Sequence, residues 1–346
     1  MQKVRETANM EAEKLIAREA IRMKIVITRQ LPQEAMALLR AHADTVEWPH
    51  AEQPASRSFL EEHIGDADGV VCLLTERIDA ALLARAPRLK AVGTMSVGYN
   101  HIDVKAATER GVLVTNTPDV LTETTADLAF ALLMATARRL VEASDYLRRG
   151  QWTTWSPLQL TGMDVFGATL GIIGMGRIGE AVARRAQGFG MNVLYHNRSR
   201  KPEAEERLGL TYAELPRLLS ESDFVVVLTP YTPQTAGLIR KEQLQLMKPT
   251  AVLINIARGG IVDEADLYDA LRSGSLWAAG LDVFETEPVP ASHPLLTLPN
   301  VVTLPHIGSA SVRTRTQMAL LAAEGVLQAL AGQRPRHVVN PEAYAR

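Results

Sequence analysis

Short apolar runs alternate with stretches of helix-forming residues along most of the chain. Each run is apolar at consecutive positions, which predicts a strand covered on both faces, as in a parallel sheet flanked by helices. In the first third of the chain we expect four such strands: Lys24–Thr28, Gly69–Leu74, Ala91–Thr94 and Val112–Thr115. The alternation therefore predicts the α/β fold class.

A second and denser series of apolar runs follows later in the chain. Its six expected strands are Thr169–Gly174, Asn192–His196, Phe224–Thr229, Val252–Ile256, Ala279–Phe284 and Val301–Leu304. Six buried strands separated by helices match a doubly wound parallel sheet in number and spacing. The chain is therefore expected to form two Rossmann-like α/β domains with a cleft between them.

A helical stretch joins the two series, and we expect it to run from about Thr122 to Arg149 with Thr122 as its N-cap. Its middle, residues 128–135, is apolar on every face, so the helix must be covered all round. Two explanations stay open at this point. The helix packs between the two domains, or it is buried in a subunit interface, which would make the protein a homodimer.

These expectations divide the chain into three parts. Residues 1–22 form an N-terminal extension, because the first predicted strand begins after them. One domain comprises residues 23–121 and 311–346, since the last predicted helix, Arg313–Leu330, is expected to cross back to it. The other domain comprises residues 122–310.

The composition is that of an ordinary soluble globular chain and disfavours several kinds of partner. With 47% apolar residues, 22% charged residues and a formal net charge of -2, the chain has no basic field that would gather nucleic acid or a membrane. Its longest later apolar run, residues 128–137, is too short to cross a bilayer. A single cysteine, Cys72, excludes a disulfide framework and a multi-thiolate metal site. We expect a cytoplasmic protein without a metal, and a Cys72 thiol buried in its strand.

The N-terminal extension lacks the features of a targeting signal. It has no apolar core of the kind found in secretory signals. It also contains Glu6, Glu11, Glu13 and Glu19, whereas transit peptides avoid acidic residues. Both observations agree with a cytoplasmic location.

A glycine-rich G-x-G-x-x-G motif lies between a predicted strand and a predicted helix: Gly174, Met175, Gly176, Arg177, Ile178 and Gly179. In that context the motif binds the pyrophosphate of a dinucleotide. The first glycine allows a tight turn, the second lets backbone amides approach the pyrophosphate, and the third permits close packing of helix and strand. Residues 122–310 are therefore expected to form an NAD(P)-binding Rossmann domain.

The next predicted strand ends in a basic turn, at the place where dinucleotide-binding proteins often carry an acid. Such an acid binds the 2′-OH of the adenosine ribose and would repel a 2′-phosphate. Here the turn contains Asn197, Arg198, Ser199 and Arg200. Two guanidinium groups can bracket a phosphate, with the amide and hydroxyl as neutral donors, and would favour NADP over NAD by about a hundredfold or more. The turn predicts NADPH as the preferred cofactor, with NAD as the alternative.

Side chains suited to hydride-transfer chemistry follow three of the later strands. Reduction of a 2-oxo acid requires a cation that holds the carboxylate and polarises the carbonyl, and a proton donor for the developing alkoxide. Arg258 and His306 follow two of these strands, and between them an acid, Glu285 or Glu287, could accept the other ring N–H of the histidine. The remaining cofactor contacts are expected on or after the same strands: Thr229, Pro230, Ala257, Asp282, His306 and Gly308.

Six stretches of the chain together resemble the D-isomer-specific 2-hydroxyacid dehydrogenase family, over nearly its whole length from residue 23 to about residue 341. They are Ser96-Val-Gly-Tyr99, Asn116-Thr-Pro118, Gly174–Gly179, Asn255-Ile-Ala-Arg-Gly259, Gly280-Leu-Asp-Val-Phe-Glu285 and Pro305-His-Ile-Gly-Ser309. Within that family the chain is most similar to the glyoxylate/hydroxypyruvate reductases. The resemblance implies that residues 23–121 and 311–346 are the substrate-binding (catalytic) domain.

The resemblance also implies roles for individual residues. Arg258 would bind the carboxylate and carbonyl of the substrate, His306 would donate the proton, and Glu287 would orient His306. The backbone amides of Val97 and Gly98 would receive the substrate carboxylate.

The segment Gln151–Pro157 contains Trp-Thr-Thr-Trp, which is similar to an element of some of these reductases. There the second tryptophan, Trp155 by position, reaches the active site of the partner subunit and limits substrate size, which again implies a homodimer. The alternative is that both indoles anchor the loop. One departure from the family is Asn100, where an aspartate is common, and it touches none of the three catalytic groups.

The expected function is therefore the NADPH-preferring reduction of small 2-oxo acids, glyoxylate and hydroxypyruvate, to D-2-hydroxy acids. Other D-2-hydroxyacid dehydrogenases stay open: 2-ketogluconate reductase, and D-3-phosphoglycerate or D-lactate dehydrogenase, although the missing ribose-binding acid disfavours the last two. The alternative from a different class is a non-enzymatic dinucleotide sensor like the transcriptional corepressors of this fold. The presence of Arg258, Glu287 and His306 disfavours a sensor.

Overall fold

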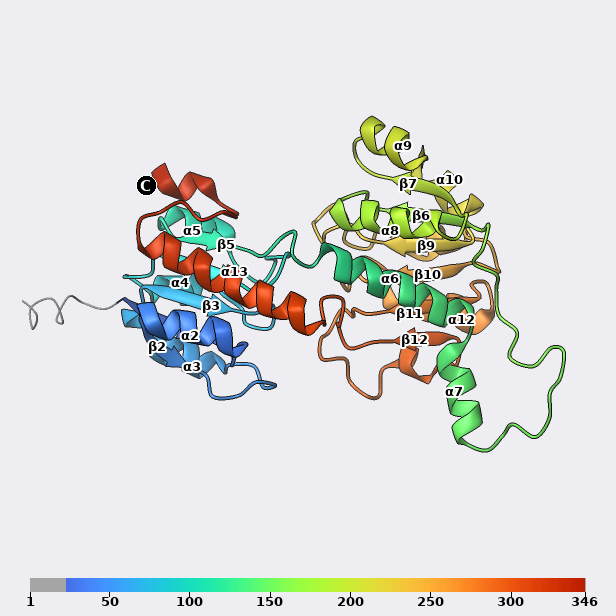
Figure 1. The fold of residues 1–346 in the computed structure, drawn as a ribbon, viewed down its shortest axis with the longest axis horizontal. Coiled ribbons are helices and arrows are strands. Elements are labelled where there is room, and N and C mark those ends of the chain that lie inside the picture. The colour runs from blue at the N-terminus through green and yellow to red at the C-terminus, as the bar shows by residue number, and fades with distance from the viewer. Residues whose placement is uncertain (1–22, 346) are drawn as a thin grey trace, which may run out of the picture. The chain divides into compact units, whose positions relative to one another are not determined.

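The computed structural model describes residues 23–345, which form two compact units (Figure 1). Unit 1 contains residues 23–120 and 312–345, and unit 2 contains Leu121–Ser311. Each unit is built on one parallel sheet, so the expected α/β fold class is confirmed. The N-terminal extension expected over residues 1–22 lies outside the described residues.

The sheet of unit 1 has five strands in the order β2-β1-β3-β4-β5. They are β1 (Lys24–Ile27), β2 (Asp44–Glu47), β3 (Gly69–Cys72), β4 (Ala91–Thr94) and β5 (Leu113–Thr115). The helices are α2 (Gln33–His42), α3 (Arg57–His63), α4 (Ala80–Ala84), α5 (Val104–Glu109) and α13 (Val312–Leu330), with short 3₁₀ turns at Ile64–Asp66 and Pro341–Ala345. Strand β2 is absent from the expected set because its residues, Asp-Thr-Val-Glu, are mostly polar and only partly buried at the sheet edge.

Helix α13 follows the whole of unit 2 in the sequence, yet it packs on the sheet of unit 1 (Figure 1). Glycines in the strands make room for it. A Cβ atom on Gly93 would lie 2.6 Å from Val326 Cγ2 and 2.8 Å from the carbonyl oxygen of Ala322, and one on Gly69 would lie 2.8 Å from Val326 Cγ1. The two glycines therefore allow the helix to approach the strand backbones directly.

The sheet of unit 2 has seven strands in the order β12-β11-β10-β9-β6-β7-β8. They are β6 (Thr169–Ile173), β7 (Asn192–His196), β8 (Thr211–Tyr212), β9 (Phe224–Val227), β10 (Val252–Asn255), β11 (Ala278–Leu281) and β12 (Val301–Thr303). The helices are α6 (Thr122–Ala137), α7 (Leu140–Arg148), α8 (Arg177–Gln187), α9 (Pro202–Leu208), α10 (Leu215–Glu221), α11 (Lys241–Leu244) and α12 (Glu264–Ser273), with a 3₁₀ turn at Pro294–Thr297. The strand order reverses between β6 and β9, which is the place where open α/β sheets bind ligands.

Both faces of this second sheet are buried, as its continuous apolar runs predict. Ile172 and Val226 belong to the core layer beneath α6 and α8, whereas their neighbours Ile173 and Val225 belong to the layer beneath α10, α11 and α12. Consecutive strand residues point to opposite faces, so only a strand covered on both sides needs apolar residues at every position.

The prediction of a single helix over residues 122–149 is wrong in two respects, the continuity of the helix and its N-cap. Helix α6 ends at Ala137, and Arg139 has a left-handed φ of 53° that no continuous helix allows. Helix α7 then starts in a new direction (Figure 1). The N-cap is Leu121 rather than Thr122, and it has no side-chain capping hydrogen bond.

The apolar side chains of α6 pack mainly within unit 2 itself. Leu132 and Leu133 are buried in the core of unit 2, and the helix packs on β10, β11, β12 and α8 of the same unit. A Cβ atom on Gly280 of β11 would lie 2.7 Å from Thr136 Oγ1 and 2.8 Å from Leu132 Cγ, so the helix rests directly on the strand. Most of α6 is therefore covered by its own sheet and the neighbouring helix.

Cys72 has no exposed surface in β3, and burial raises the pKa of its thiol, so the expected buried thiol is confirmed. Among the helices of residues 23–345, none is both long enough and apolar enough to span a membrane.

Candidate active site

The glycine motif forms the turn from β6 into α8. Gly174 has a φ of 104°, and a Cβ atom there would lie 2.7 Å from the backbone nitrogen of Thr229. A Cβ atom on Gly179 would lie 2.5 Å from the carbonyl oxygen of Gly174. The first and third glycines thus permit close packing of strand, turn and helix, while a Cβ on Gly176 would meet nothing within 4 Å.

The N-terminus of α8 is suited to an anion. Its N-cap is Gly176, and no side chain caps the first turn. The helix is 11 residues long, and its first backbone N–H groups carry partial positive charge beside the open space over Gly176. Of the other motif residues, Met175 is fully buried in the core, whereas Arg177 is exposed and Ile178 is half-buried. These features fit the pyrophosphate of a dinucleotide.

The basic turn at the end of β7 presents its two arginines differently. Arg198 is exposed, and within residues 23–345 its guanidinium forms no hydrogen bond or ion pair. Arg200 is held by Glu205 of α9, with Nη2 2.5 Å from Oε2 and Nε 3.1 Å from Oε1. Asn197 Nδ2 donates to the carbonyl oxygen of Ser199 at 3.1 Å, which closes the turn. Of the two arginines predicted to bind the phosphate, Arg198 therefore has no partner in the described part of the chain, whereas Arg200 is held by Glu205.

Further predicted cofactor contacts lie at the same edge of the sheet. Thr229 and Pro230 follow β9, and the backbone of Thr229 packs on the first glycine of the motif. Ala257 follows β10, and its N–H donates to Asn255 Oδ1 at 3.1 Å. Because β6, β9 and β10 are parallel neighbours, their carboxyl ends lie together.

Arg258 follows β10 and lies next to the segment after β11. Its carbonyl oxygen accepts a hydrogen bond of 3.1 Å from Asn255 Nδ2, and its Nη1 donates to the Ala257 carbonyl oxygen at 2.7 Å. A Cβ on the following residue, Gly259, would lie 1.9 Å from the carbonyl oxygen of Phe284, so only glycine fits there. Burial lowers the pKa of Arg258 against the opposing effect of the Glu287 charge. A guanidinium that is partly desolvated is well placed to bind an anionic ligand.

His306 and Glu287 form a hydrogen-bonded pair. The imidazole Nδ1 lies 2.6 Å from Glu287 Oε2, and both side chains are about one quarter exposed, at 25% and 26%. Glu287 Oε1 accepts from the N–H of Phe284 at 3.0 Å, which fixes the carboxylate. His306 has a left-handed φ of 53°, a conformation that is uncommon outside glycine and is often found at functional sites.

The carboxylate of this pair is ionised over the ordinary pH range. Burial tends to raise the pKa of Glu287, but the hydrogen bond and charge of His306, the Phe284 amide and the charge of Arg258 together hold that pKa below its ordinary value. A carboxylate in that state accepts the Nδ1–H of His306 and directs the other ring nitrogen, Nε2, away from the pair. The arrangement can therefore deliver a proton from Nε2.

Asp282 supports the loop that carries His306. The strand expected to run to Phe284 ends at Leu281, and the next residue is Asp282, which has 1% of its surface exposed. Its two carboxylate oxygens accept hydrogen bonds of 2.8 Å each from the N–H groups of Ile307 and Gly308. Desolvation raises the pKa of Asp282 even though these amides oppose the shift. Asp282 thus fixes the backbone directly after His306.

The loop after β4 in unit 1 presents two free amides. The Ser96 hydroxyl donates to the Gly98 carbonyl oxygen at 2.6 Å, and Asn116 Nδ2 donates to the Val97 carbonyl oxygen at 2.8 Å. In the described part of the chain, the N–H groups of Val97 and Gly98 donate to no protein acceptor. Side chains therefore hold the two carbonyls, and the two N–H groups stay available for an anion.

Comparison with known proteins decides the family. A family model described as D-isomer specific 2-hydroxyacid dehydrogenase, NAD binding domain, matches residues 130–308. A glyoxylate reductase of Korarchaeum cryptofilum is 50% identical over 320 residues, which cover 92% of this chain and 96% of the relative. A glyoxylate reductase of Thermococcus kodakarensis is 49% identical over 326 residues, covering 93% and 97%. The chain belongs to the D-isomer-specific 2-hydroxyacid dehydrogenase family.

Solved structures that are similar to this chain have the same fold. A protein of Thermus thermophilus is 46% identical with a TM-score of 0.86, covering 92% of this chain and all (100%) of that one. An NADPH-dependent glyoxylate/hydroxypyruvate reductase of Sinorhizobium meliloti, solved with NADP and malonate, is 36% identical with a TM-score of 0.83, covering 93% and 98%. The resemblance drawn from the six sequence stretches is confirmed, and the chain is an NAD(P)-dependent oxidoreductase of 2-hydroxy acids.

Three polar side chains position the backbone around the dehydrogenase site, and the sequence did not predict this role for any of them. Asn255 shapes the turn that carries Arg258, and Asn116 holds the loop of Val97, yet both lie in stretches that carry the family resemblance. Their amides act on backbone groups that the sequence alone does not place. Asp282 is among the predicted cofactor contacts, but both of its oxygens are engaged by backbone N–H groups.

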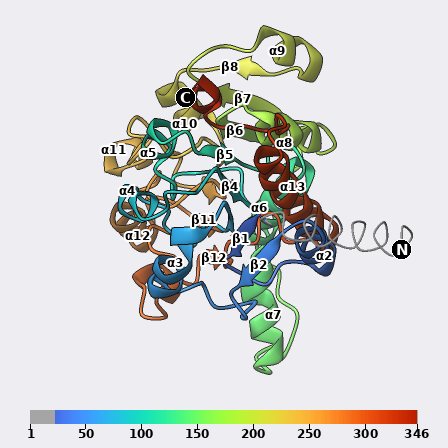
Figure 2. The same ribbon diagram turned by 90° about the vertical axis from the view of Figure 1, so that its left-hand side faces the viewer.

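The segment that carries Trp155 leaves most of its apolar side chains uncovered. Helix α7 has no buried residue, and α7 and the segment after it extend away from the sheet of unit 2 in both views (Figures 1 and 2). Trp155 is 75% exposed, and it forms no ring contact within the described residues. The structure of this single chain therefore does not anchor Trp155.

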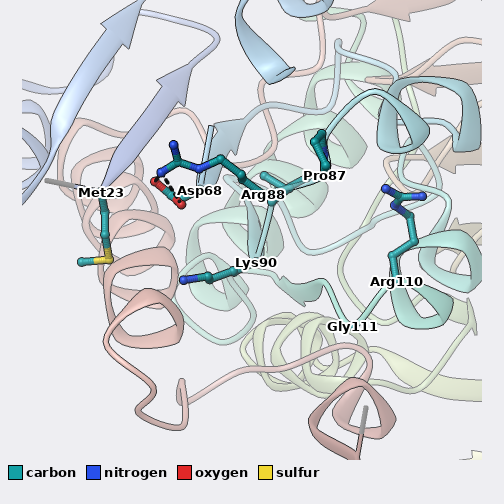
Figure 3. Close-up of a pocket in the computed structure, with 8 residues that line it drawn as sticks. Met23, Asp68, Pro87, Arg88, Lys90, Arg110 and Gly111 are labelled. Carbon is teal, nitrogen blue, oxygen red and sulfur yellow. Dashed lines mark hydrogen bonds and ion pairs between the residues drawn. The ribbon is translucent and has the colours of Figure 1, made fainter. Parts of the chain in front are cut away.

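A pocket of about 620 Å³ lies in unit 1, at the amino ends of β3, β4 and β5 (Figure 3). Three cations, Arg88, Lys90 and Arg110, line it, and Arg88 points toward Asp68, with Nη2 3.0 Å from Oδ2 (Figure 3). The Val97 and Gly98 amides follow the carboxyl end of β4, so the pocket lies at the opposite edge of the sheet. None of the predicted site residues lines it.

Proposed function

We propose that this dehydrogenase reduces small 2-oxo acids, glyoxylate and hydroxypyruvate, to D-2-hydroxy acids with NADPH as its preferred reductant. The observation that carries the proposal is the 2.6 Å pair of His306 and Glu287, next to Arg258, at the carboxyl ends of neighbouring strands of a dinucleotide-binding sheet. The names of the relatives support the substrates, since those cited from Korarchaeum cryptofilum and Thermococcus kodakarensis are both glyoxylate reductases.

In the proposed reaction, each side chain of the site has one task. Arg258 binds the substrate carboxylate and carbonyl oxygen, and stabilises the negative charge that develops on that oxygen. His306 donates a proton from Nε2 to the same oxygen, and Glu287 holds the ring in that orientation. The N–H groups of Val97 and Gly98 bind the carboxylate in addition. A reduced nicotinamide cofactor, when bound, would supply the hydride to C2 of the 2-oxo acid.

The glycine turn and the strand ends would hold the cofactor. The first turn of α8, with residues 174–179, receives the pyrophosphate, and Thr229, Pro230, Ala257, Asp282 and Gly308 flank the rest. Asn197, Arg198, Ser199 and Arg200 receive the 2′-phosphate, which makes NADPH the preferred cofactor and NADH the weaker one. Support comes from the Sinorhizobium meliloti relative, whose structure contains NADP.

We further propose that the protein acts as a homodimer through the exposed apolar side chains of α7 and the following segment. Leu140 and Leu147 are 54% and 58% exposed, and Leu158 and Phe166 are 82% and 81% exposed. Apolar groups exposed at this density in one segment mark an interaction surface. In the dimer, Trp155 would reach the partner subunit's active site and limit the size of the substrate.

A panel of small 2-oxo acids, assayed with NADPH and with NADH in parallel, tests the proposed function. We expect the highest kcat/KM with glyoxylate or hydroxypyruvate and NADPH. A higher value with 2-ketogluconate, a 3-phosphorylated acid or pyruvate would replace the proposed substrate. Absence of turnover with every acid would favour the dinucleotide sensor instead.

A further inference from the structure

The carboxylate of Glu205 lies at the centre of a hydrogen-bond network behind the basic turn of β7. The hydroxyl of Tyr195 donates to Oε1 at 2.6 Å, and Arg200 approaches both carboxylate oxygens, at 3.1 and 2.5 Å. The same hydroxyl accepts from the backbone N–H of Lys201 at 2.7 Å. One acidic side chain on α9 therefore ties the buried part of β7 to the far end of residues 197–201.

This network fixes Arg200 on two sides. The Nε and Nη2 atoms form a fork on Glu205, and the guanidinium carbon lies 5.6 Å from the ring centroid of Tyr212, within the range of a cation–π contact. A guanidinium has five N–H donors, and the fork on Glu205 uses one from Nε and one from Nη2. Both N–H groups of Nη1 stay available, so Arg200 can bind a second anion while Glu205 holds it.

The charges of the network are set in a way that keeps it intact near neutral pH. The Glu205 side chain is 15% exposed, and hydrogen bonds from Arg200 and Tyr195 hold the pKa of its carboxyl below the ordinary value. Tyr195 has no exposed surface, and burial together with Glu205 raises the pKa of its hydroxyl. Glu205 is thus an ionised acceptor and Tyr195 a neutral donor. With the protons placed in this way, the carboxylate of Glu205 and the hydroxyl of Tyr195 both have hydrogen-bond partners.

Preorganisation is what distinguishes Arg200 from Arg198. A long exposed side chain loses conformational entropy when it becomes ordered on a bound phosphate. Arg198 is exposed and would bear this cost. Arg200 is already ordered by its fork and by the Tyr212 ring. The backbone of the turn is ordered too, because Lys201 N–H is bonded to Tyr195.

We infer that Glu205 is a positioning residue that sets the choice between NADPH and NADH. It holds Arg200 and the backbone of residues 197–201 in the arrangement that receives a 2′-phosphate. The inference rests on the proposed NADPH preference and extends it to a residue that carries the wrong charge to bind phosphate itself. A carboxylate that instead competed with the phosphate for Arg200 would weaken NADPH binding, so its removal would have an effect of the opposite sign.

The test measures the dissociation constants of NADPH and NADH by fluorescence titration, and of 2′,5′-ADP and 5′-AMP by competition. The variants are Glu205→Ala, Glu205→Gln and, as a matched control on the same helix, Glu206→Ala, whose side chain is exposed. We expect Glu205→Ala to weaken NADPH and 2′,5′-ADP about tenfold, with NADH and 5′-AMP changed by less than about twofold. Glu205→Gln keeps an oxygen that can accept from Tyr195 but removes the negative charge that holds Arg200. Its loss of NADPH affinity should therefore be smaller than that of Glu205→Ala. Glu206→Ala should change none of the four constants.

Each other result would overturn the inference in a distinguishable way. Tighter NADPH binding by Glu205→Ala would show that the carboxylate competes with the phosphate. Equal weakening of NADPH and NADH binding would show a general structural role for Glu205 in α9. If Glu205→Ala does not fold, the same comparison of dissociation constants is made with Glu205→Gln. Equal affinity of the unaltered protein for NADPH and NADH would instead remove the proposed NADPH preference itself, and the role of Glu205 with it.

Discussion

His306 Nδ1 lies 2.6 Å from Glu287 Oε2, although the two residues are 19 positions apart and follow different strands. Each partner is fixed from behind. The second oxygen of Glu287 accepts from the Phe284 N–H, and the backbone after His306 is bonded to Asp282. The imidazole therefore has one orientation, with Nε2 as the nitrogen left for a ligand.

Replacement of His306 tests the proton donor. His306→Ala removes the donor and leaves the glycine turn and basic turn intact, so kcat should fall by about 10²- to 10⁴-fold while the dissociation constant of NADPH stays nearly unchanged. Steady-state kinetics and fluorescence titration measure the two quantities on one preparation. Equal losses in turnover and cofactor affinity would contradict the proposed role.

Replacement of Glu287 tests the ionised carboxylate through its effect on stability. In the folded protein the pKa of Glu287 lies below its ordinary value, so the carboxylate stabilises the fold above that ordinary value, and the contribution is lost as pH falls through the folded pKa. Glu287→Gln cannot titrate. The Tm difference between the unaltered protein and Glu287→Gln should therefore be largest near pH 7 and shrink toward about pH 3. A difference that is constant with pH would show that the pair adds no pH-dependent stability.

Much of this arrangement could be predicted from the sequence because its signals are local. The glycine motif is a contiguous turn whose context can be read on either side, and Arg258 and His306 each follow an apolar strand directly. The strand pattern by itself did not decide whether Glu285 or Glu287 accepts the hydrogen bond of His306. The structure pairs His306 with Glu287, because that choice depends on how the irregular segment after Leu281 folds, and no strand pattern extends into it.

What the sequence could not supply depends on contacts between elements. The fork of Arg200 on Glu205 joins a turn to the next helix, so a count of cations in the turn treats Arg198 and Arg200 alike. The break of the long helix at Arg139 leaves no proline or glycine as a marker. Strands β2 and β8 are short and only partly buried, so they lack the apolar run that identifies the others.

Replacement of Arg258 tests substrate binding. Arg258→Ala removes the cation that would hold the carboxylate and the developing oxyanion, so kcat/KM should fall by about 10²- to 10³-fold or more. Arg258→Lys keeps the charge but loses the planar fork, and should recover only part of the loss. Michaelis kinetics with glyoxylate at saturating NADPH measure both variants. Full activity of the lysine variant would show that only a charge is needed at this position.

Replacement of Arg198 tests the free cation of the basic turn. Because Arg198 is exposed and has no protein partner within residues 23–345, Arg198→Ala should leave the fold and Tm unchanged. The KM for NADPH should rise about tenfold or more, whereas the KM for NADH should stay the same. Arg217→Ala, which removes an exposed arginine of α10, serves as the control for a general loss of positive charge. A change that is equal for both cofactors would mean that Arg198 does not contact the 2′-phosphate.

The exposed apolar side chains of α7 lead to a prediction about assembly. Leu140 and Leu147 are more than half exposed on a helix that buries none of its residues, so a charge at either position should cost the isolated chain little but disrupt an interface. We expect the unaltered protein to sediment as a dimer and the double variant Leu140→Asp, Leu147→Asp to sediment as a monomer with an unchanged circular dichroism spectrum. If Trp155 acts across that interface, Trp155→Ala and the monomeric variant should both accept bulkier 2-oxo acids than the unaltered protein. A dimer that survives both aspartates would place the interface elsewhere, and an unchanged substrate range in Trp155→Ala would leave the indole without a role in selectivity.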